Sequence, residues 1–298
     1  YEISLGLVGS EMCIRDRLMD TTVFFVILLA TIMHAIWNAM VKHHPDKAIA
    51  VLAIVLGHIP LALICIFYFP LPGRESLPYI IASVLAHQGY QWYMLNSYKV
   101  GDYTNVYPIF RGFGPLLATL ISIIFLGVVF KIATLFSILL ICVGIMFLGL
   151  FGSKNQNQIE IIKYSLLTGS FIGLYSLIDG YGARVSTSAI SYISFSFLFS
   201  GFLFPIILKL NKHENIFSKV FKDAKMIFWV GGSISFVIYV IVVWGFTKAP
   251  IPLVAALRET SIFFSIFIGY FFLKETINLK KIISIALIVI GVIGIKLF

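Results

Sequence analysis

The chain has 298 residues, of which 60% are hydrophobic and 12% charged, and its mean hydropathy is +1.00. An ordinary soluble domain has about 45–50% apolar and about 25% charged residues, so this composition excludes a soluble globular protein and indicates an integral membrane protein. The formal net charge of +9 does not indicate nucleic-acid binding, because the lysines fall mainly in short segments between apolar runs, where they mark membrane topology and contacts with lipid headgroups.

The first 17 residues, "YEISLGLVGSEMCIRDR", differ in character from the rest of the chain. The DNA string CTC GTG GGC TCG GAG ATG TGT ATA AGA GAC, of the kind found in transposon-type sequencing adapters, translates in frame as Leu7 to Asp16. The segment also lacks the apolar stretch and the cleavage site of a signal peptide. We therefore expect residues 1–17 to be an adapter artefact and the genuine chain to start at Met19.

Beyond this segment, apolar runs of about 20 residues recur, which is the length that an α-helix needs to cross the hydrocarbon core of a membrane. Short breaks with turn-forming residues separate the runs, among them "KHHPDK", "PLPGRES" and "GSKNQNQ". Because the runs are continuous rather than alternating, a transmembrane β-barrel is excluded. The sequence predicts an all-α integral membrane protein with ten transmembrane helices, over residues 21–41, 48–69, 78–98, 103–126, 131–152, 162–183, 189–208, 226–247, 250–273 and 279–298.

The second half of the chain repeats the first. The stretch "FLGVVFKIATLFSILLICVGIMF" aligns with "FLKETINLKKIISIALIVIGVIG" at an offset of 147 residues, and the same offset places Arg111 on Arg258. Since five helices per copy is an odd number, the two copies enter the membrane in opposite orientations, and inverted repeats of this kind hold substrates near the midplane in secondary transporters. We predict a first repeat over residues 19–152, a linker over 153–161 and a second repeat over 162–298.

Local motifs add to the repeat. The element "AIWN" with Trp37, the element "GLYS" with Tyr175, and the turn "FLKETI" before the last span resemble the drug/metabolite transporter superfamily, EamA type. The resemblance covers essentially residues 19–298, and it implies a multi-pass transporter of a bacterial-type inner (plasma) membrane rather than an enzyme. Members of this family usually carry a glutamate at that turn in both halves, whereas this chain has Glu275 in the second half and Val128 in the first. We therefore interpret Glu275 as a structural cap.

Two arginines lie inside predicted spans, where a charge at the helix centre costs about 2.5–3.5 kcal/mol. Arg111, in "VYPIFRGFGP", and Arg258, in "VAALRETSI", each lie on a stripe of small and polar residues at helical spacing. Guanidinium groups bind carboxylate, phosphate and phosphonate bidentately, so the pair predicts an anion site. Plastid phosphate translocators, of the same superfamily, are similar in using basic residues on these helices. The alternative is that Arg111 pairs with Glu259, or Arg258 with Asp179, only to hold the bundle together.

Two intramembrane carboxylates are candidates for coupling transport to an ion gradient. Glu259 could bind a coupling proton, or it could simply neutralise a neighbouring arginine. Asp179, in "LIDGYGAR", lies near a predicted span end with Arg184 just beyond it, which favours an ion pair at the membrane interface over a coupling role.

Polar and aromatic side chains of the first, third and sixth spans suit the wall of a cavity, although hydrogen bonds between helices explain them equally well. His58, beside Pro60, is expected to pack at a kink. The histidines lack the spacing of a metal site, and no P-loop, Rossmann or GxSxG pattern is present, so we expect no metal, cofactor or catalytic residues. The predicted substrate-binding residues are Arg111, Arg258, His34, Trp37, Asn38, His87, Tyr90, Gln91 and Tyr175.

The leading hypothesis is a secondary transporter that moves a small anionic metabolite (an organic anion, a phosphonate or an amino-acid-like compound) by alternating access. Its partners would be this substrate, the lipid bilayer and a coupling proton or other ion, with no nucleic acid, and two copies could form a homodimer. One alternative is an intramembrane enzyme that acts on a lipid-linked substrate, which would need a nucleophile–base or metal constellation that the residue spacing does not contain. Another is a channel or a permease component.

The membrane orientation is left open by two conflicting signals. The family resemblance implies cytoplasmic termini. Lysines, however, are concentrated in the loops that follow odd-numbered spans, and the positive-inside rule would put those loops in the cytoplasm. One of these loops, "ENIFSKVFKDAK", is also expected to form a short interfacial helix, with its apolar face made by Ile216, Phe217, Val220 and Phe221.

Overall fold

The computed structural model of the chain describes residues 19–150, 158–273 and 278–298. The expected adapter segment, the first part of the expected linker and Glu275 lie outside these residues. Within them every regular element is helical and none is a strand, which confirms the all-α prediction. The elements are α2 (Thr21–His43), α3 (Lys47–Gly57), α4 (Ile59–Tyr68), η1 (Arg74–Ser76), α5 (Leu77–Val100), α6 (Tyr103–Ile124), α7 (Ile132–Leu150), α8 (Gln158–Val185), α9 (Ala189–Leu210), α10 (Ile216–Asp223), η2 (Ile227–Gly231), α11 (Gly232–Phe246), α12 (Ile251–Glu259), α13 (Ser261–Leu273) and α14 (Leu279–Leu297).

In the described part of the chain, seven helical segments are long and apolar enough to cross a membrane. They are α2, α3 with α4, α6, α7, α8, α9, and the π-helical turn η2 with α11. Helices also occupy the other three predicted spans: α5 is rich in polar side chains, α12 and α13 are interrupted at Thr260, and α14 carries three lysines. The protein is therefore a multi-pass membrane protein, and the number of ten spans stays a prediction.

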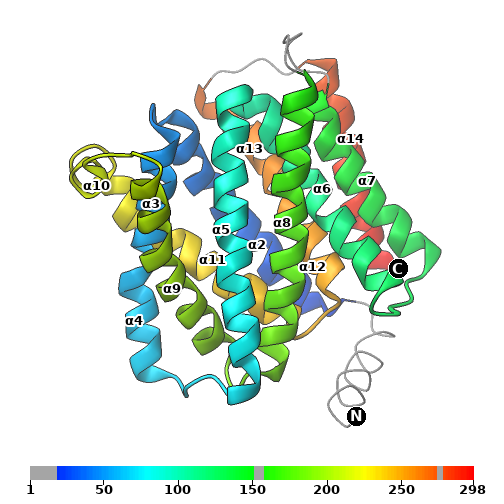
Figure 1. The fold of residues 1–298 in the computed structure, drawn as a ribbon. Helices are drawn as coiled ribbons and strands as arrows, with labels where there is room; N and C mark the ends of the chain where they lie inside the picture. Colours follow the sequence, from blue (N-terminus) through cyan, green and yellow to red (C-terminus); the bar gives the residue numbers. More distant parts are fainter. Residues whose placement is uncertain (1–18, 151–157, 274–277) are drawn as a thin grey trace.

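The helices form one bundle in which the two halves of the chain interlock (Figure 1). The first helix of the first half, α2, packs against α11, α12 and α13 of the second half. The first helix of the second half, α8, packs against α5 and α6 of the first half. The pair α7 and α14 lies together at one side, and α9 packs against α4 and α5. The interior of the bundle is therefore built by both halves.

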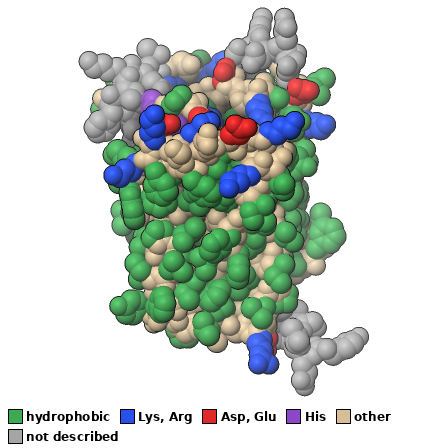
Figure 2. Space-filling view, turned by 60° about the vertical axis from the view of Figure 1, so that its left-hand side comes forward, with side chains coloured by type: hydrophobic (Ala, Val, Ile, Leu, Met, Phe, Trp, Pro, Cys, Tyr) green, Lys and Arg blue, Asp and Glu red, His purple; other side chains and the backbone are tan. Residues whose placement is uncertain are grey.

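The surface divides into an apolar band and a charged end (Figure 2). Hydrophobic side chains cover most of the bundle side seen in this view, as expected for contact with lipid tails. Most of the Lys and Arg side chains in this view gather at one end. We call this the lysine-rich end; its helix termini carry Lys42, Lys47, Lys99, Lys163 and Lys209. The lysines of the odd-numbered loops thus share one end of the bundle, as their sequence positions predict.

The expected interfacial helix is present as α10, which confirms that this segment is helical. Its apolar face, however, is divided between two environments. Ile216 and Val220 are buried, because α10 packs against α3, whereas Phe217 and Phe221 are 41% and 51% exposed. Only half of the expected apolar face is therefore available to a lipid surface.

Gly57 of α3 and Gly232 of α11 allow the backbones of these two helices to touch where the helices cross. A Cβ atom added at Gly232 would lie 2.6 Å from the Cα of Gly57, and one added at Gly57 would lie 2.9 Å from the Cα of Gly232. Real Cβ atoms do not approach other atoms this closely, and backbone atoms cannot rotate away as a side-chain end can. Close crossings of this kind let membrane helices associate by packing alone.

We expect Gly232→Ala to lower the free energy of unfolding by about 1–3 kcal/mol, because overpacking at this crossing outweighs the gain of up to ~1 kcal/mol in helix propensity. Unfolding of the purified protein in mixed micelles measures the change. The matched control is Gly73→Ala, where the nearest heavy atom would lie at an ordinary 3.8 Å. Equal stability of the two variants would contradict the prediction.

Candidate functional site

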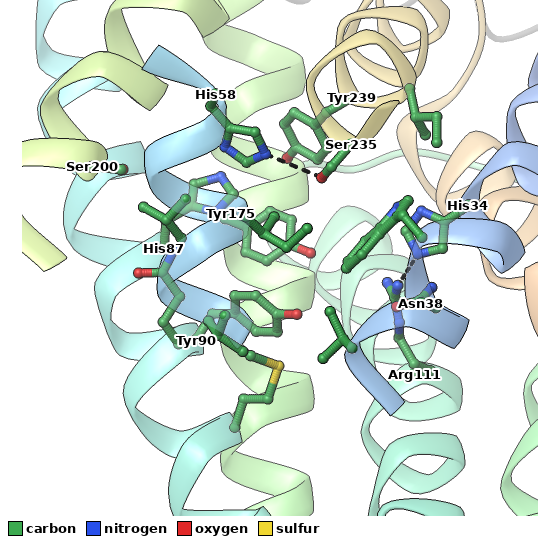
Figure 3. A pocket seen from close by; sticks show the side chains of 18 of the residues that line it. His34, Asn38, His58, His87, Tyr90, Arg111, Tyr175, Ser200, Ser235 and Tyr239 are labelled. Atoms are coloured by element: carbon green, nitrogen blue, oxygen red, sulfur yellow. Dashed lines mark hydrogen bonds between the residues drawn. The ribbon is translucent and has the colours of Figure 1, made fainter. Parts of the chain in front are cut away.

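An internal cavity lies between the two halves of the bundle, with a wall contributed by α2, α3, α5, α6, α8, α9, α11 and α12 (Figure 3). The space open to the centres of water molecules is about 100 Å³. Since one water needs about 10–15 Å³ by this measure, the cavity has room for several waters or a small molecule. All nine predicted substrate-binding residues line it. The structure thus brings them to one place, and whether they bind a substrate stays a prediction.

Two arginines converge on one carboxylate beside this cavity. Arg111 Nη1 of α6 lies 3.1 Å from Glu259 Oε1 and 3.0 Å from Oε2. Arg258 of α12 donates to Glu259 Oε1 from Nε at 3.0 Å and from Nη2 at 2.7 Å. The three side chains are buried. The expected alternative of an Arg111–Glu259 pair is therefore present, and Arg258 joins the same carboxylate rather than Asp179. Two guanidinium groups and one carboxylate give this cluster one net positive charge.

Arg111 has further partners on its own helix and on α2. Its Nε donates to the hydroxyl of Tyr107 at 3.1 Å, and its guanidinium lies 5.2 Å from the centre of the Tyr107 ring. Its Nη2 contacts His34 Nε2. Because a guanidinium can only donate, His34 Nε2 accepts, which assigns the proton of a neutral imidazole to Nδ1. His34 is thus positioned as a neutral ring with a donor nitrogen left for another group.

A ladder of tyrosines connects Arg111 with the lysine-rich end. The rings of Tyr98 and Tyr103 stack at 5.3 Å, and those of Tyr103 and Tyr107 stack at 4.7 Å. Tyr98 lies two residues before the end of α5, and Tyr103 is the first residue of α6. This ladder was not predicted from the sequence, although Tyr103, Tyr107 and Arg111 recur every four residues and therefore share one helix face. The cavity extends along the ladder towards the lysine-rich end.

Asp179 is the centre of a second polar cluster. Its side chain is fully buried on α8 and receives contacts from three other helices. Tyr192 of α9 donates its hydroxyl to Oδ1 at 3.1 Å, and Tyr239 of α11 donates its hydroxyl to Oδ2 at 2.5 Å. His87 of α5 places Nε2 3.1 Å from Oδ2. One carboxylate therefore ties together α5, α8, α9 and α11.

This environment differs from the ion pair with Arg184 that the sequence favoured. The helix α8 continues to Val185, so Asp179 lies more than one turn inside it and faces the bundle interior instead of the interface. Arg184 donates from Nε to the carbonyl of Phe246 at 2.9 Å and from Nη2 to the carbonyl of Ala249 at 3.1 Å. It thereby satisfies backbone groups at the end of α11, a role that the sequence did not indicate.

The two polar clusters meet at Tyr175. His87 stacks on the Tyr175 ring with 4.2 Å between ring centres. The guanidinium of Arg258 lies 5.7 Å from the centre of the same ring. One aromatic side chain therefore separates the arginine cluster from the Asp179 cluster.

His58 has a larger role at the cavity than the sequence suggested. It lies between α3 and α4, two residues before Pro60, which confirms its position at a helix break. Its ring also stacks on Phe197 at 4.4 Å, and Nε2 lies 3.1 Å from the hydroxyl of Ser235. His58 and Ser235 both line the cavity. A break inside an apolar run marks such a position, but it does not reveal what the side chain contacts.

Several buried polar atoms on the cavity wall have no hydrogen-bond partner within the described part of the chain. Buried polar groups in proteins are almost always satisfied by other groups, by water or by a ligand. The wall therefore offers both donors and acceptors to a polar molecule. These atoms are His34 Nδ1, Trp37 Nε1, Asn38 Nδ2, Gln91 Oε1 and Ser200 Oγ.

Known proteins resemble this chain in two respects: the sequence of its second half and its overall fold. Residues 160–297 match the family described as the EamA-like transporter family. No curated protein matches the chain. Several solved structures match the chain; one of them, a crystal structure, does so over 92% of this chain and 95% of its own, with a TM-score of 0.67 and 17% sequence identity. At this identity the likeness shows a shared fold alone, and it extends over nearly the whole chain.

Proposed function

We propose that this protein is a secondary transporter of the drug/metabolite type that moves a small anionic metabolite by alternating access. The match of residues 160–297 to the EamA-like transporter family supports a role in transport. Its place would be a bacterial-type inner (plasma) membrane. The observation that carries the proposal is the pair Arg111 and Arg258, which come from different halves of the chain and meet beside one cavity with a single carboxylate between them.

The charge balance of the arginine cluster supports an anionic substrate. Glu259 offsets one of the two guanidinium charges and leaves the other for a ligand. A monovalent carboxylate, a phosphonate or the carboxylate of an amino-acid-like compound would supply the missing charge and accept the parallel hydrogen bonds that a guanidinium offers. The aromatic rings of Trp37, Tyr90 and Tyr175 would then pack against the body of the substrate.

The packing of α7 against α14 supports a two-fold relation between the halves. A Cβ atom at Gly144 would lie 3.2 Å from the carbonyl oxygen of Ser284, and one at Gly291 would lie 2.7 Å from the carbonyl oxygen of Ser137. Gly144 and Gly291 are 147 residues apart, and so are Ser137 and Ser284. A two-fold axis that exchanges the halves produces this reciprocal pair of contacts. Inverted repeats that rock about a central site are the usual basis of alternating access.

The test begins with a thermal-shift screen of the purified protein against phosphonates, phosphate esters, carboxylates, amino acids and organic cations. We expect stabilising compounds among the anions. Arg111→Gln and Arg258→Gln should each weaken binding of the best anion about 10- to 100-fold, because each removes a charged hydrogen-bond donor worth about 1.5–3 kcal/mol. Uptake of that anion into proteoliposomes should fall in parallel.

The matched control is Arg74→Gln, which removes an exposed arginine in η1 on the opposite side of the bundle from the lysine-rich end. It should leave binding unchanged. Stabilising compounds found only among the cations, or unchanged affinity in both cavity-arginine variants, would overturn the proposal.

A further inference from the structure

The two buried carboxylates beside the cavity have opposite chemical surroundings. Glu259 is held by two arginines, whereas Asp179 is held by two tyrosine hydroxyls and an imidazole. From this difference, and resting on the proposed transport function, we infer that Asp179 and His87 together form the proton-binding site of the transporter, whereas Glu259 remains ionised throughout the transport cycle.

Glu259 is unsuited to proton exchange because its partners cannot adapt to a neutral carboxyl. An arginine is always charged and only donates hydrogen bonds. Both guanidinium groups approach the carboxylate to 3.1 Å or less. A proton on Glu259 would leave two buried positive charges beside each other without a counter-ion, which is strongly unfavourable in a low-dielectric interior. Glu259 is therefore a fixed counter-ion of the arginine pair.

Asp179 is suited to proton exchange because each of its partners can adapt. The hydroxyls of Tyr192 and Tyr239 donate to an ionised carboxylate and can accept from a protonated one. The imidazole of His87 can gain or lose a proton, and histidine is the side chain whose charge ordinarily changes in the neutral pH range. Each direct partner of Asp179 can therefore form a hydrogen bond with both its ionised and its protonated form.

The charged and titratable groups closest to Asp179 lie on α5, α8, α9 and α11. His87 on α5, Tyr192 on α9 and Tyr239 on α11 contact the carboxylate directly. On α8 itself, Tyr175 stacks on His87, and Arg184 is directed to carbonyls at the end of α11. Two further groups act at longer range: Arg258 of α12, which contacts Glu259, and His58, which stacks on Phe197.

The arrangement couples the proton to the anion. The two arginines and the two carboxylates balance one another in charge while the cavity is empty. A bound monovalent anion adds one negative charge, and a proton on Asp179 or His87 removes it. The two clusters are separated only by the ring of Tyr175, so each ligand favours binding of the other in this poorly screened interior, and the effect is reciprocal. The expected stoichiometry is one proton per monovalent anion.

Asp179 also lies near helix ends on one side of the bundle, so a proton bound there can influence whether the cavity is closed on that side. Asp179 is six residues from the end of α8, and Tyr192 is three residues from the start of α9, both on the side opposite the lysine-rich end. The hydrogen bonds of Asp179 join helices of both halves at that side. Protonation weakens the charge-assisted bonds that hold these helices together, which links proton binding to opening of the opposite end.

Infrared difference spectroscopy of the purified protein tests the proton site without a substrate. On acidification we expect a carbonyl band of a buried protonated carboxyl in the wild type, its loss in Asp179→Asn, and its retention in the double variant Arg111→Gln/Glu259→Gln, which removes one charge of each sign. Tyr239→Phe removes one donor to the carboxylate and should move the midpoint of the band to higher pH by about one unit or more. If Asp179→Asn does not fold, the shift of the midpoint in Tyr239→Phe still tests the inference.

Persistence of the band in Asp179→Asn, its loss in the double variant, or an unmoved midpoint in Tyr239→Phe would overturn the inference. A second measurement follows proton uptake from weakly buffered solution when methanesulfonate, a permanent monoanion, is added. The wild type should take up protons and Asp179→Asn should not; uptake that persists in Asp179→Asn contradicts the coupling. A protein that binds no anion but keeps the Asp179 band would refute the proposed function and leave the proton site established.

Discussion

Replacing Glu259 by glutamine is expected to lower the free energy of unfolding by about 3–5 kcal/mol, because it leaves two buried guanidinium groups without their shared counter-ion. Glutamine keeps the size and one acceptor oxygen, so the loss isolates the charge. Unfolding in mixed micelles of a mild and a denaturing detergent measures it. The control Glu160→Gln removes an exposed carboxylate at the start of α8 and should change stability by less than about 0.5 kcal/mol.

A double-variant cycle sharpens this prediction. Adding Arg111→Gln to Glu259→Gln removes one of the two uncompensated charges, so the double variant should be more stable than Glu259→Gln alone. The coupling energy between the two positions should be about 1–3 kcal/mol, the range for residues in direct contact. Strict additivity, with the double variant less stable than either single one, would show that the pair does not interact as the geometry requires.

Asp179→Ala is expected to have the second large effect, a loss of about 2–4 kcal/mol. It removes the carboxylate that Tyr192, Tyr239 and His87 share as a hydrogen-bond partner, so all three side chains lose this bond inside the bundle. Asp179→Asn keeps one acceptor oxygen and should lose less than half as much. The same unfolding measurement compares the two variants. Equal losses would mean that the negative charge of the carboxylate, which both variants remove, and not the acceptor oxygen that asparagine keeps, matters at this position.

Much of the fold could be predicted from the sequence because the apolar runs are long. A run of 20 apolar residues has few alternatives to a membrane helix, and a helix occupies each predicted span. The interruptions were harder to foresee. Pro108 and Pro115 lie inside α6 without ending it, whereas the helix of Arg258 stops at Glu259 without any proline nearby in its last turn. Whether a helix continues or stops depends on how neighbouring helices contact its backbone groups, and the local sequence does not reveal those contacts.

The candidate site was accessible from the sequence only in part. An arginine in a membrane span is so costly that its position inside the bundle is almost dictated, and the repeat paired Arg111 with Arg258. Which carboxylate each arginine contacts depends on how helices far apart in the chain rotate against one another. The sequence therefore suggested Asp179 as a partner of an arginine, whereas its partners are aromatic and imidazole groups on three other helices.

The lysine-rich end has a kinetic consequence for any anion that approaches the cavity from that side. Lysines outnumber carboxylates at these helix termini, and Tyr98 and Tyr103 lead inward from the same end to Arg111. A positive potential at this end of the bundle raises the local concentration of anions and speeds their association, as in other electrostatically steered encounters. Added salt screens that potential over about 10 Å at 0.1 M. The association rate should therefore fall steeply with ionic strength, while dissociation from the buried arginines changes little.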